Sequence, residues 1–155
     1  MQRSYNTRIL MLALCLLLGA LPAAVAARPF GLSGSGNLTF TGGNPPTGAT
    51  LTASGTATHL GRWTSDGVLS FTPHPTDPTL ILASGTQTFI AANGDELDVT
   101  FINAVLDTTT GIANGVFIFV GGTGRFEDAS GNAPFVVMQD PSGPFEVTAT
   151  GSIDY

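Results

Sequence analysis

The chain has 155 residues, of which 43% are apolar and only 10% are charged, with 20 glycines and 10 prolines. This composition excludes a disordered chain, which would be poor in apolar residues, and it is too rich in Gly and Pro for a helical bundle. The formal net charge is −6 and there is no lysine. The chain therefore lacks the basic patch that phosphate backbones require, and we expect no nucleic-acid partner.

The first 26 residues have the anatomy of an export signal. Two arginines precede the ten-residue apolar run 9–18, and Ala24 to Ala26 fits the small-x-small cleavage pattern. The run is too short to cross ~30 Å of hydrocarbon, so we expect a cleaved signal peptide over 1–26 rather than a membrane anchor. The remaining domain, 27–155, should be secreted or periplasmic, with no membrane span after cleavage. The single Cys15 leaves with the signal, and the net charge becomes 3 − 11 = −8 because two of the five arginines leave too.

The rest of the chain is predicted to form strand after strand. Segments rich in Thr, Val, Ile and Phe alternate with turns rich in Gly, Asn, Asp and Pro, and Asn93-Gly94-Asp95 is a strong tight-turn signal. No segment has a sustained 3.6-residue period, so we expect almost no helix. The expected strands are 35–41, 49–63, 67–72, 79–91, 96–106, 112–120, 132–139 and 144–155.

A period of two also predicts which residues face the interior. The inward positions Ala53, Gly55, Ala57 and Gly85 are small and are expected to leave volume inside the fold. The sequence ASGTAT at 53–58 recurs as ASGTQT at 83–88. We interpret this echo as two strands with equivalent positions.

Two later strands alternate equally clearly. Over 96–106 we expect Leu97, Val99, Phe101 and Val105 to face inward. The last strand alternates as far as Tyr155, so its apolar face should be built into the sheet.

About eight antiparallel strands in one short domain must pair their edges, because open edges invite aggregation. We therefore predict an all-β fold, a single small antiparallel eight-stranded barrel, with a β-sandwich as the alternative.

The most distinctive motif is Gly121-Gly122-Thr123-Gly124-Arg125-Phe126. It is not a phosphate loop, because no Gly-Lys-Ser/Thr follows and the acidic residues after it would repel phosphate. We interpret Gly121, Gly122, Gly124, Arg125 and Phe126 as a structural turn whose glycines supply positive φ. Arg125 is expected to pair with one of three nearby acids: Glu127, Asp128 or Asp98.

The segment 121–131, GGTGRFEDASG, resembles the GGTG-basic-Phe-x-x-Ala-x-Gly stretch of dirigent proteins and their relatives in the allene oxide cyclase-like barrel superfamily. The segment 57–63, ATHLGRW, is similar to an ATHLGRF-type strand of small secreted bacterial proteins of unknown function. The resemblance implies a short eight-stranded barrel with a central cavity, which in the plant members handles small hydrophobic or phenolic molecules. The catalytic acids of those members have no matching positions here, so the resemblance implies no activity.

Few residues offer chemistry. His59 shares the inward parity of its strand with Trp63, and together they are the candidate lining of a cavity. His59 is interpreted either as a proton donor or acceptor or, more conservatively, as a hydrogen-bonded histidine at the barrel mouth. Two histidines and no mature cysteine give no ordinary zinc site, and no catalytic residue or cofactor is predicted.

Three functions compete. We rank first a non-enzymatic binding module that holds a small hydrophobic or phenolic molecule. A structural or surface-interaction protein with a filled barrel comes second, because the ten phenylalanines could occupy the interior. A cyclase- or isomerase-type enzyme comes third, because it needs an inward-facing acid or base and only His59 qualifies.

Overall fold

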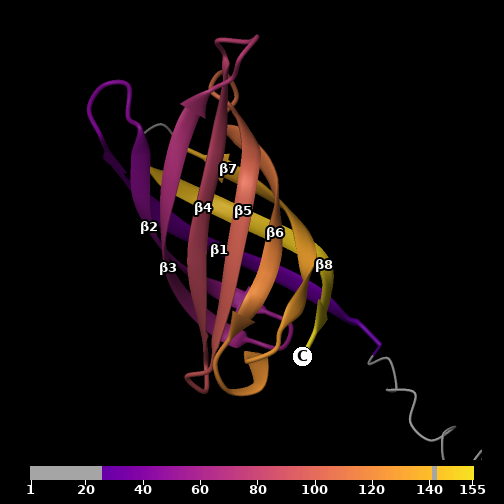
Figure 1. Ribbon diagram of the computed structural model, residues 1–155. Coiled ribbons are helices and arrows are strands. Elements are labelled where there is room, and N and C mark those ends of the chain that lie inside the picture. Colours follow the sequence, from indigo (N-terminus) through magenta and orange to yellow (C-terminus); the bar gives the residue numbers. More distant parts are fainter. Residues whose placement is uncertain (1–25, 141–142) are drawn as a thin grey trace, which may run out of the picture.

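The computed structural model describes residues 26–140 and 143–155, which form a closed antiparallel barrel of eight strands (Figure 1). The expected export signal lies outside the described residues except for Ala26. The strands are β1 (Arg28–Thr41), β2 (Gly48–Ala57), β3 (Gly61–Pro73), β4 (Leu80–Ala91), β5 (Glu96–Asp107), β6 (Ile112–Gly122), β7 (Ser130–Gln139) and β8 (Pro144–Asp154).

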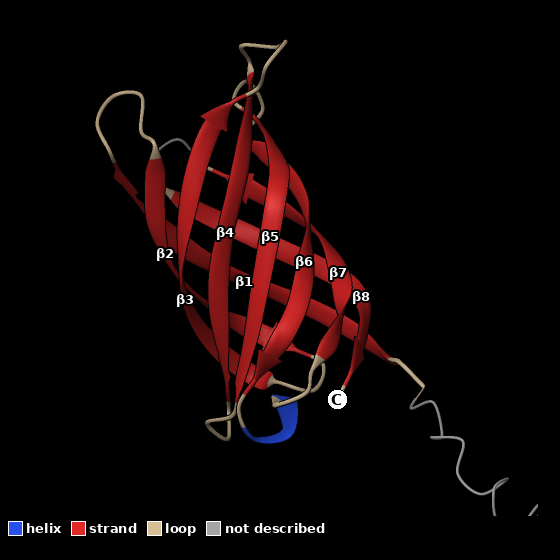
Figure 2. Ribbon diagram, viewed as in Figure 1, coloured by secondary structure: helices blue, strands red, loops and turns tan. Residues whose placement is uncertain are grey.

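The strands follow one another around the barrel in chain order, and β1 pairs with β8 to close it. This seam runs from Arg28 opposite Ile153 to Asn37 opposite Pro144. The predicted eight-stranded barrel is confirmed, and the sandwich alternative is wrong. The described part of the chain has no α-helix and one 3-10 turn, η1 (Gly124–Phe126), at one end of the barrel (Figure 2). None of its helical segments has the length and apolar character to cross a bilayer.

The expected strand 49–63 is wrong, because it contains β2, a hairpin turn and the start of β3. The turn at 58–60 places His59 at φ 68° and is followed by Gly61 at φ 69°. The residue types keep alternating through this turn, so the sequence pattern alone predicts one continuous strand there. The strand count came out right only because 67–72 is the remainder of β3.

The expected inward position of Val105 is also wrong, because β5 contains a bulge. Asn103 adopts φ 55°, and the pairing register shifts between Thr100 and Val105. The extra residue moves Ala104 into the core and leaves Val105 36% exposed. Leu97, Val99 and Phe101, which precede the bulge, are buried as predicted.

The two ends of the barrel differ. The β2–β3 and β4–β5 turns, η1 and the C-terminus lie at one end, where Leu60, Leu97, Phe126 and Ile153 are at most 1% exposed. We call this the sealed end. At the other end, where β1 leads into β2 and β3 into β4, inward side chains such as Leu38 are only partly buried. We call this the open end.

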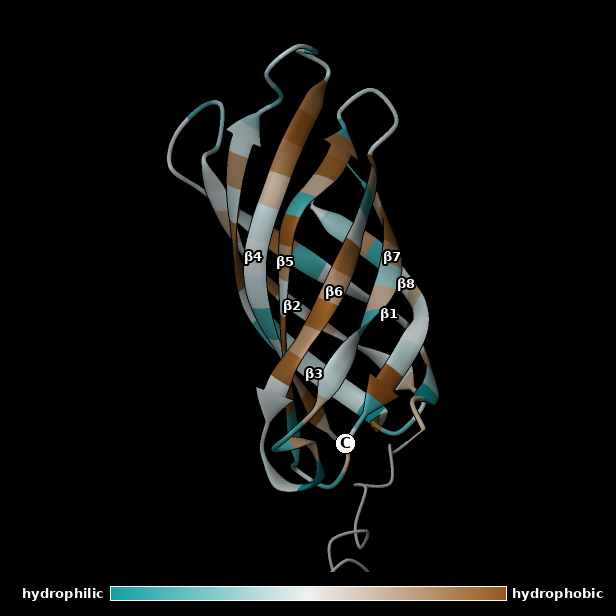
Figure 3. Cartoon of the chain, turned by 45° about the vertical axis from the view of Figure 1, so that its right-hand side comes forward, coloured by the Kyte–Doolittle hydropathy of each residue, from teal (hydrophilic) through white to brown (hydrophobic). Residues whose placement is uncertain are grey.

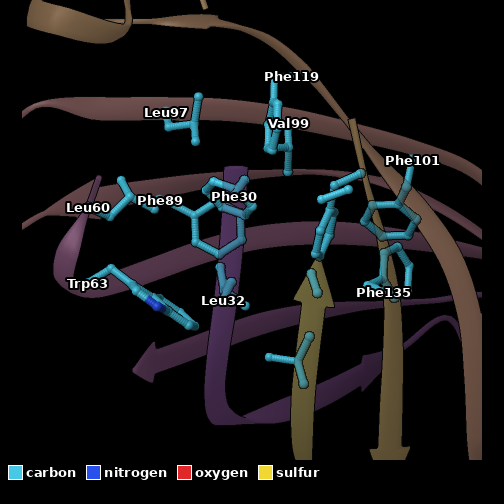
Figure 4. Close-up of a cluster of buried hydrophobic side chains, with 14 of the residues drawn as sticks. Phe30, Leu32, Leu60, Trp63, Phe89, Leu97, Val99, Phe101, Phe119 and Phe135 are labelled. Atoms are coloured by element: carbon cyan, nitrogen blue, oxygen red, sulfur yellow. The ribbon is translucent and has the colours of Figure 1, made fainter. Parts of the chain in front are cut away.

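Aromatic and aliphatic side chains from several strands cluster in the barrel interior (Figure 4). A Cβ on Gly34 would collide with the ring of Trp63, and a Cβ on Gly115 would collide with the ring of Phe135. At Gly85 a Cβ would meet the ring of Phe101 at 3.0 Å. Small residues on one strand therefore make room for large residues of other strands, and less volume is left than the sequence suggested.

Candidate ligand-binding cavity

A cavity of about 70 Å³ occupies the open half of the barrel. Seventeen residues from all eight strands line it, and fifteen of these are apolar. The two polar lining residues are Gln87 of β4 and Gln139 at the end of β7. The wall is thus almost entirely apolar, which suits an apolar ligand with few polar groups.

Phenylalanine rings form much of the wall. Phe101 meets Phe135 edge-on with centroids 5.6 Å apart, and Phe117 lies 4.3 Å from Phe135. Phe89 contacts Phe117 at 5.8 Å in the same edge-on manner. Such interlocked rings hold one another in place, so this wall is preformed rather than fluid.

Gln87 brings a polar group into this apolar wall. It is buried, and its Nε2 donates to Oγ of the buried Ser65 on β3 across 2.7 Å. A glutamine amide has two N–H donors and an oxygen that accepts. Within the described residues, the Gln87 side chain makes this one hydrogen bond, which leaves its second N–H and its oxygen for a ligand. The amide can therefore donate to, or accept from, one polar group of a molecule in the cavity.

Hydrogen bonds fix the loops at the open end. Asp77 accepts from the Thr79 hydroxyl at 2.6 Å and from its backbone N–H at 2.9 Å, and Asp107 accepts from Thr109 in the same way. These bonds hold the pKa of both carboxyl groups below the usual aspartate value. Thr108 then links the two loops, because its N–H and its hydroxyl both donate to the Thr79 carbonyl.

The structure does not place His59 and Trp63 on the cavity wall. His59 lies in the β2–β3 turn at the sealed end, where its Nε2 lies 2.9 Å from the Pro29 carbonyl and its ring packs on Tyr155. The continuous strand assumed for 49–63 had wrongly placed His59 on an inward face. Trp63 is inward and buried, but it sits behind Phe89, edge-on at 5.1 Å, and its Nε1 has no partner within the described residues.

The GGTGRF motif lies at the sealed end, and none of its residues lines the cavity. Gly121, Gly122 and Gly124 have φ values of 106°, 157° and 58°. Phe126 is fully buried and closes the barrel. Arg125 pairs with Asp95 at 3.5 Å rather than with any of the three acids expected from the sequence.

The β4–β5 turn explains this pairing. Asn93 and Asp95 stand directly beside η1, and Nη2 of Arg125 donates to the Asn93 side-chain oxygen at 3.4 Å. Thr123 binds the start of β5, because its N–H donates to the Glu96 carbonyl and its hydroxyl accepts from the Glu96 N–H. The motif therefore joins two turns and seats Phe126. Across the described ranges, no three His, Cys, Asp or Glu side chains are grouped to hold a metal ion.

Sequence reasoning missed Gln87 and Ser65. Both occupy inward positions of their strands. The other inward residues of β4 from Ala83 to Ala91 are apolar or glycine: Ala83, Gly85, Phe89 and Ala91. The echoed sequence carried a further signal, since ASGTQT has Gln87 where ASGTAT has Ala57. A polar residue that replaces an apolar one at an inward position points to a buried polar contact.

No family model matches the chain, and no curated protein matches it either. Among solved structures, the pterocarpan synthase dirigent protein GePTS1 is similar, with 14% sequence identity and a TM-score of 0.47. The similarity covers 86% of this chain and 95% of that one. The barrel assignment rests on the strand pairing itself.

Proposed function

We propose that this chain is a non-catalytic binding protein that takes a small apolar or phenolic molecule through the open end of its barrel. The observation that carries the proposal is Gln87, a single buried amide in a wall that is otherwise apolar as far as the mouth. A phenol combines one ring with one hydroxyl, which matches this wall and this amide in chemistry.

The size of the cavity limits the ligand. Sites for drug-sized molecules are usually ~300–1,000 Å³, whereas this cavity measures about 70 Å³. A single ring or the end of an alkyl chain fits this scale better than a fused polycycle does. A larger molecule would have to leave most of its body outside the mouth.

The wall favours binding over catalysis. None of the seventeen described lining residues is titratable at its side chain, so no acid or base faces the interior to transfer a proton. His59, on which the cyclase or isomerase alternative depended, lies at the sealed end. The proposed role is therefore to hold a molecule unchanged.

Phenol and toluene test this proposal, because they have nearly the same shape and differ in the hydroxyl. We expect both to produce saturable NMR shifts at cavity residues such as Leu69 and Phe101, with phenol binding more tightly. Gln87→Leu should weaken phenol about three- to tenfold, the value of one hydrogen bond, and leave toluene nearly unchanged. Thr86→Val is the matched control, since Thr86 is the outward neighbour on the same strand.

The second candidate function is that of a structural or surface-interaction protein whose barrel is filled by its own side chains. It is favoured by the rings that occupy the space beside Gly34, Gly85 and Gly115. If neither compound shifts any cavity resonance up to its solubility limit, the binding proposal fails and a structural or surface-interaction role stands.

We also propose that the domain works outside the cytoplasm. The support is the charged start, the apolar run 9–18 and the small residues before Ala27. N-terminal sequencing of the exported protein should find Ala27 or Arg28 first. A chain that still begins at Met1 would contradict this proposal.

A further inference from the structure

We propose that the outer surface of β6, with its neighbours on β5 and β7, is a contact surface through which copies of this chain associate. Four of its outward side chains, Ile112, Val116, Ile118 and Val120, are apolar and 38–57% exposed. Outer faces of antiparallel sheets are usually polar, and strands that are apolar on both faces are typically covered on both. The inner face of β6 packs against the core, whereas its apolar outer face is exposed in the single chain.

The strands on either side widen this surface. On β7, Met138 lies opposite Ile112 and Val136 lies opposite Asn114, and both β7 side chains are exposed. On β5, Ile102 is outward by the regular alternation of the strand, and the bulge at Asn103 turns Val105 outward as well. We call this set the β6 face: Ile102, Val105, Ile112, Val116, Ile118, Val120, Val136 and Met138. Figure 3 shows apolar segments running along β6.

The distribution of charge says what kind of partner fits. The chain carries eleven acids, yet none is on β6 or among Ser130–Gln139 of β7. A basic protein would find carboxylates only along the edges of this surface, and the charged headgroups of a membrane would find no charged side chain on β6 or β7. An uncharged apolar surface is best matched by another uncharged apolar surface, and a second copy supplies one in a symmetric contact. The acids nearest the β6 face lie along its edges: Asp107 on β5 is opposite Ile112, Glu146 on β8 is opposite Met138, and Asp98 is near the start of β5.

The extent of the β6 face suits such a contact. From Ile112 to Val120 there are eight steps of ~3.3 Å, and three strands ~4.8 Å apart are about 15 Å wide with their side chains. The apolar area is therefore about 400 Å² per copy. Specific interfaces bury ~800 Å² per partner, as an apolar centre within a polar rim. Thr100 and Asn132, on either side of Ile118, border the apolar side chains, and Asn114 lies among them; all three are uncharged.

Sedimentation equilibrium of the purified, processed protein tests the proposal with a matched pair of variants. Val116 lies at the middle of the β6 face, whereas Val68 on β3 is 56% exposed but stands between Thr50 and Thr86. We expect the wild type to self-associate at micromolar concentrations. Val116→Lys should raise the dissociation constant at least about a hundredfold, because like charges would meet at the contact. Val68→Lys should change it less than about twofold.

Val116→Thr with Ile118→Thr is the second variant, because threonine keeps the branched shape that strands favour. It should weaken association about tenfold while the circular dichroism spectrum stays that of the wild type. A wild type that remains monomeric up to about a millimolar overturns the proposal, and so does a Val68→Lys variant that dissociates as fully as Val116→Lys. A monomer that binds vesicles of zwitterionic phosphatidylcholine through Val116 would assign the surface to lipid instead, and it overturns the proposal as well.

Discussion

Replacement of Phe126 by alanine tests whether one end of the barrel is sealed. Phe126 is fully buried under the sealed end, and its ring lies 5.0 Å from that of Tyr155. Truncation of a buried phenylalanine to alanine removes its contacts and leaves a cavity, which costs ~3–5 kcal/mol of unfolding free energy. The expected mature domain, 27–155, has 155 − 26 = 129 residues, so its unfolding entropy is about 0.27 kcal/mol/K. The expected fall in melting temperature is therefore about 11–18 °C.

Thermal melts followed by far-UV circular dichroism measure this fall, with Phe40→Ala as the matched control. Phe40 has the same side chain but lies toward the open end of β1 and is 43% exposed. Its truncation should cost less than ~2 kcal/mol, because only part of its apolar surface is buried. Equal losses in the two variants, or a melting temperature for Phe126→Ala within about 3 °C of the wild type, would refute the distinction between the two ends.

Three further predictions concern the turns and the seam. Gly124→Ala should destabilise by at least ~1–2 kcal/mol, because φ is 58° and the new Cβ would meet the Asp95 carboxylate, whereas Arg125→Ala should cost under ~1 kcal/mol in urea unfolding. Deletion of residues 149–155 removes about half of the β1–β8 pairing. It should abolish cooperative melting or lower the free energy of unfolding by several kcal/mol, at ~25 cal/mol per Å² of lost apolar burial. Asp107→Ala should destabilise the fold at neutral pH and match the wild type in acid. The reason is that the pKa of Asp107 is lower in the folded state than in the unfolded state, so its carboxylate stabilises the fold above the ordinary aspartate pKa. This stabilisation is lost as the pH falls through the pKa of the folded state. A difference in melting temperature between the wild type and Asp107→Ala that stays the same from neutral to acidic pH would contradict this prediction.

The architecture could be predicted from the sequence because alternation and turn residues are local signals. The last strand is an example, since Phe145, Val147, Ala149 and Ile153 are all buried as their parity predicts. Changes of conformation at single residues gave no such signal. The bulge at Asn103 reverses the inward and outward positions of every later residue in β5. Asparagine tolerates the positive φ found there, but its presence in a strand does not by itself predict a bulge.

The candidate site was harder to predict than the fold, because it depends on which end of the barrel each residue reaches. His59 was placed inside because its turn is built from Thr, His and Leu rather than from the usual Asn-Gly pair. Gln87 could have been noticed by its inward parity. The cavity volume could not have been predicted, because it depends on how the rings of Phe101 and Phe135 settle against glycines on neighbouring strands.

The seam between β1 and β8 has a practical consequence for handling the protein. Arg28 and Ile153 are partners in one strand pair, so both ends of the described barrel emerge together beside the sealed end. A surface, resin or fluorescent fusion attached at either terminus would therefore hold the domain by its base, with the mouth turned toward solution. Because the two ends are neighbours, a short peptide could also join them, and a new start could be cut at a loop such as 42–47 without removing any strand.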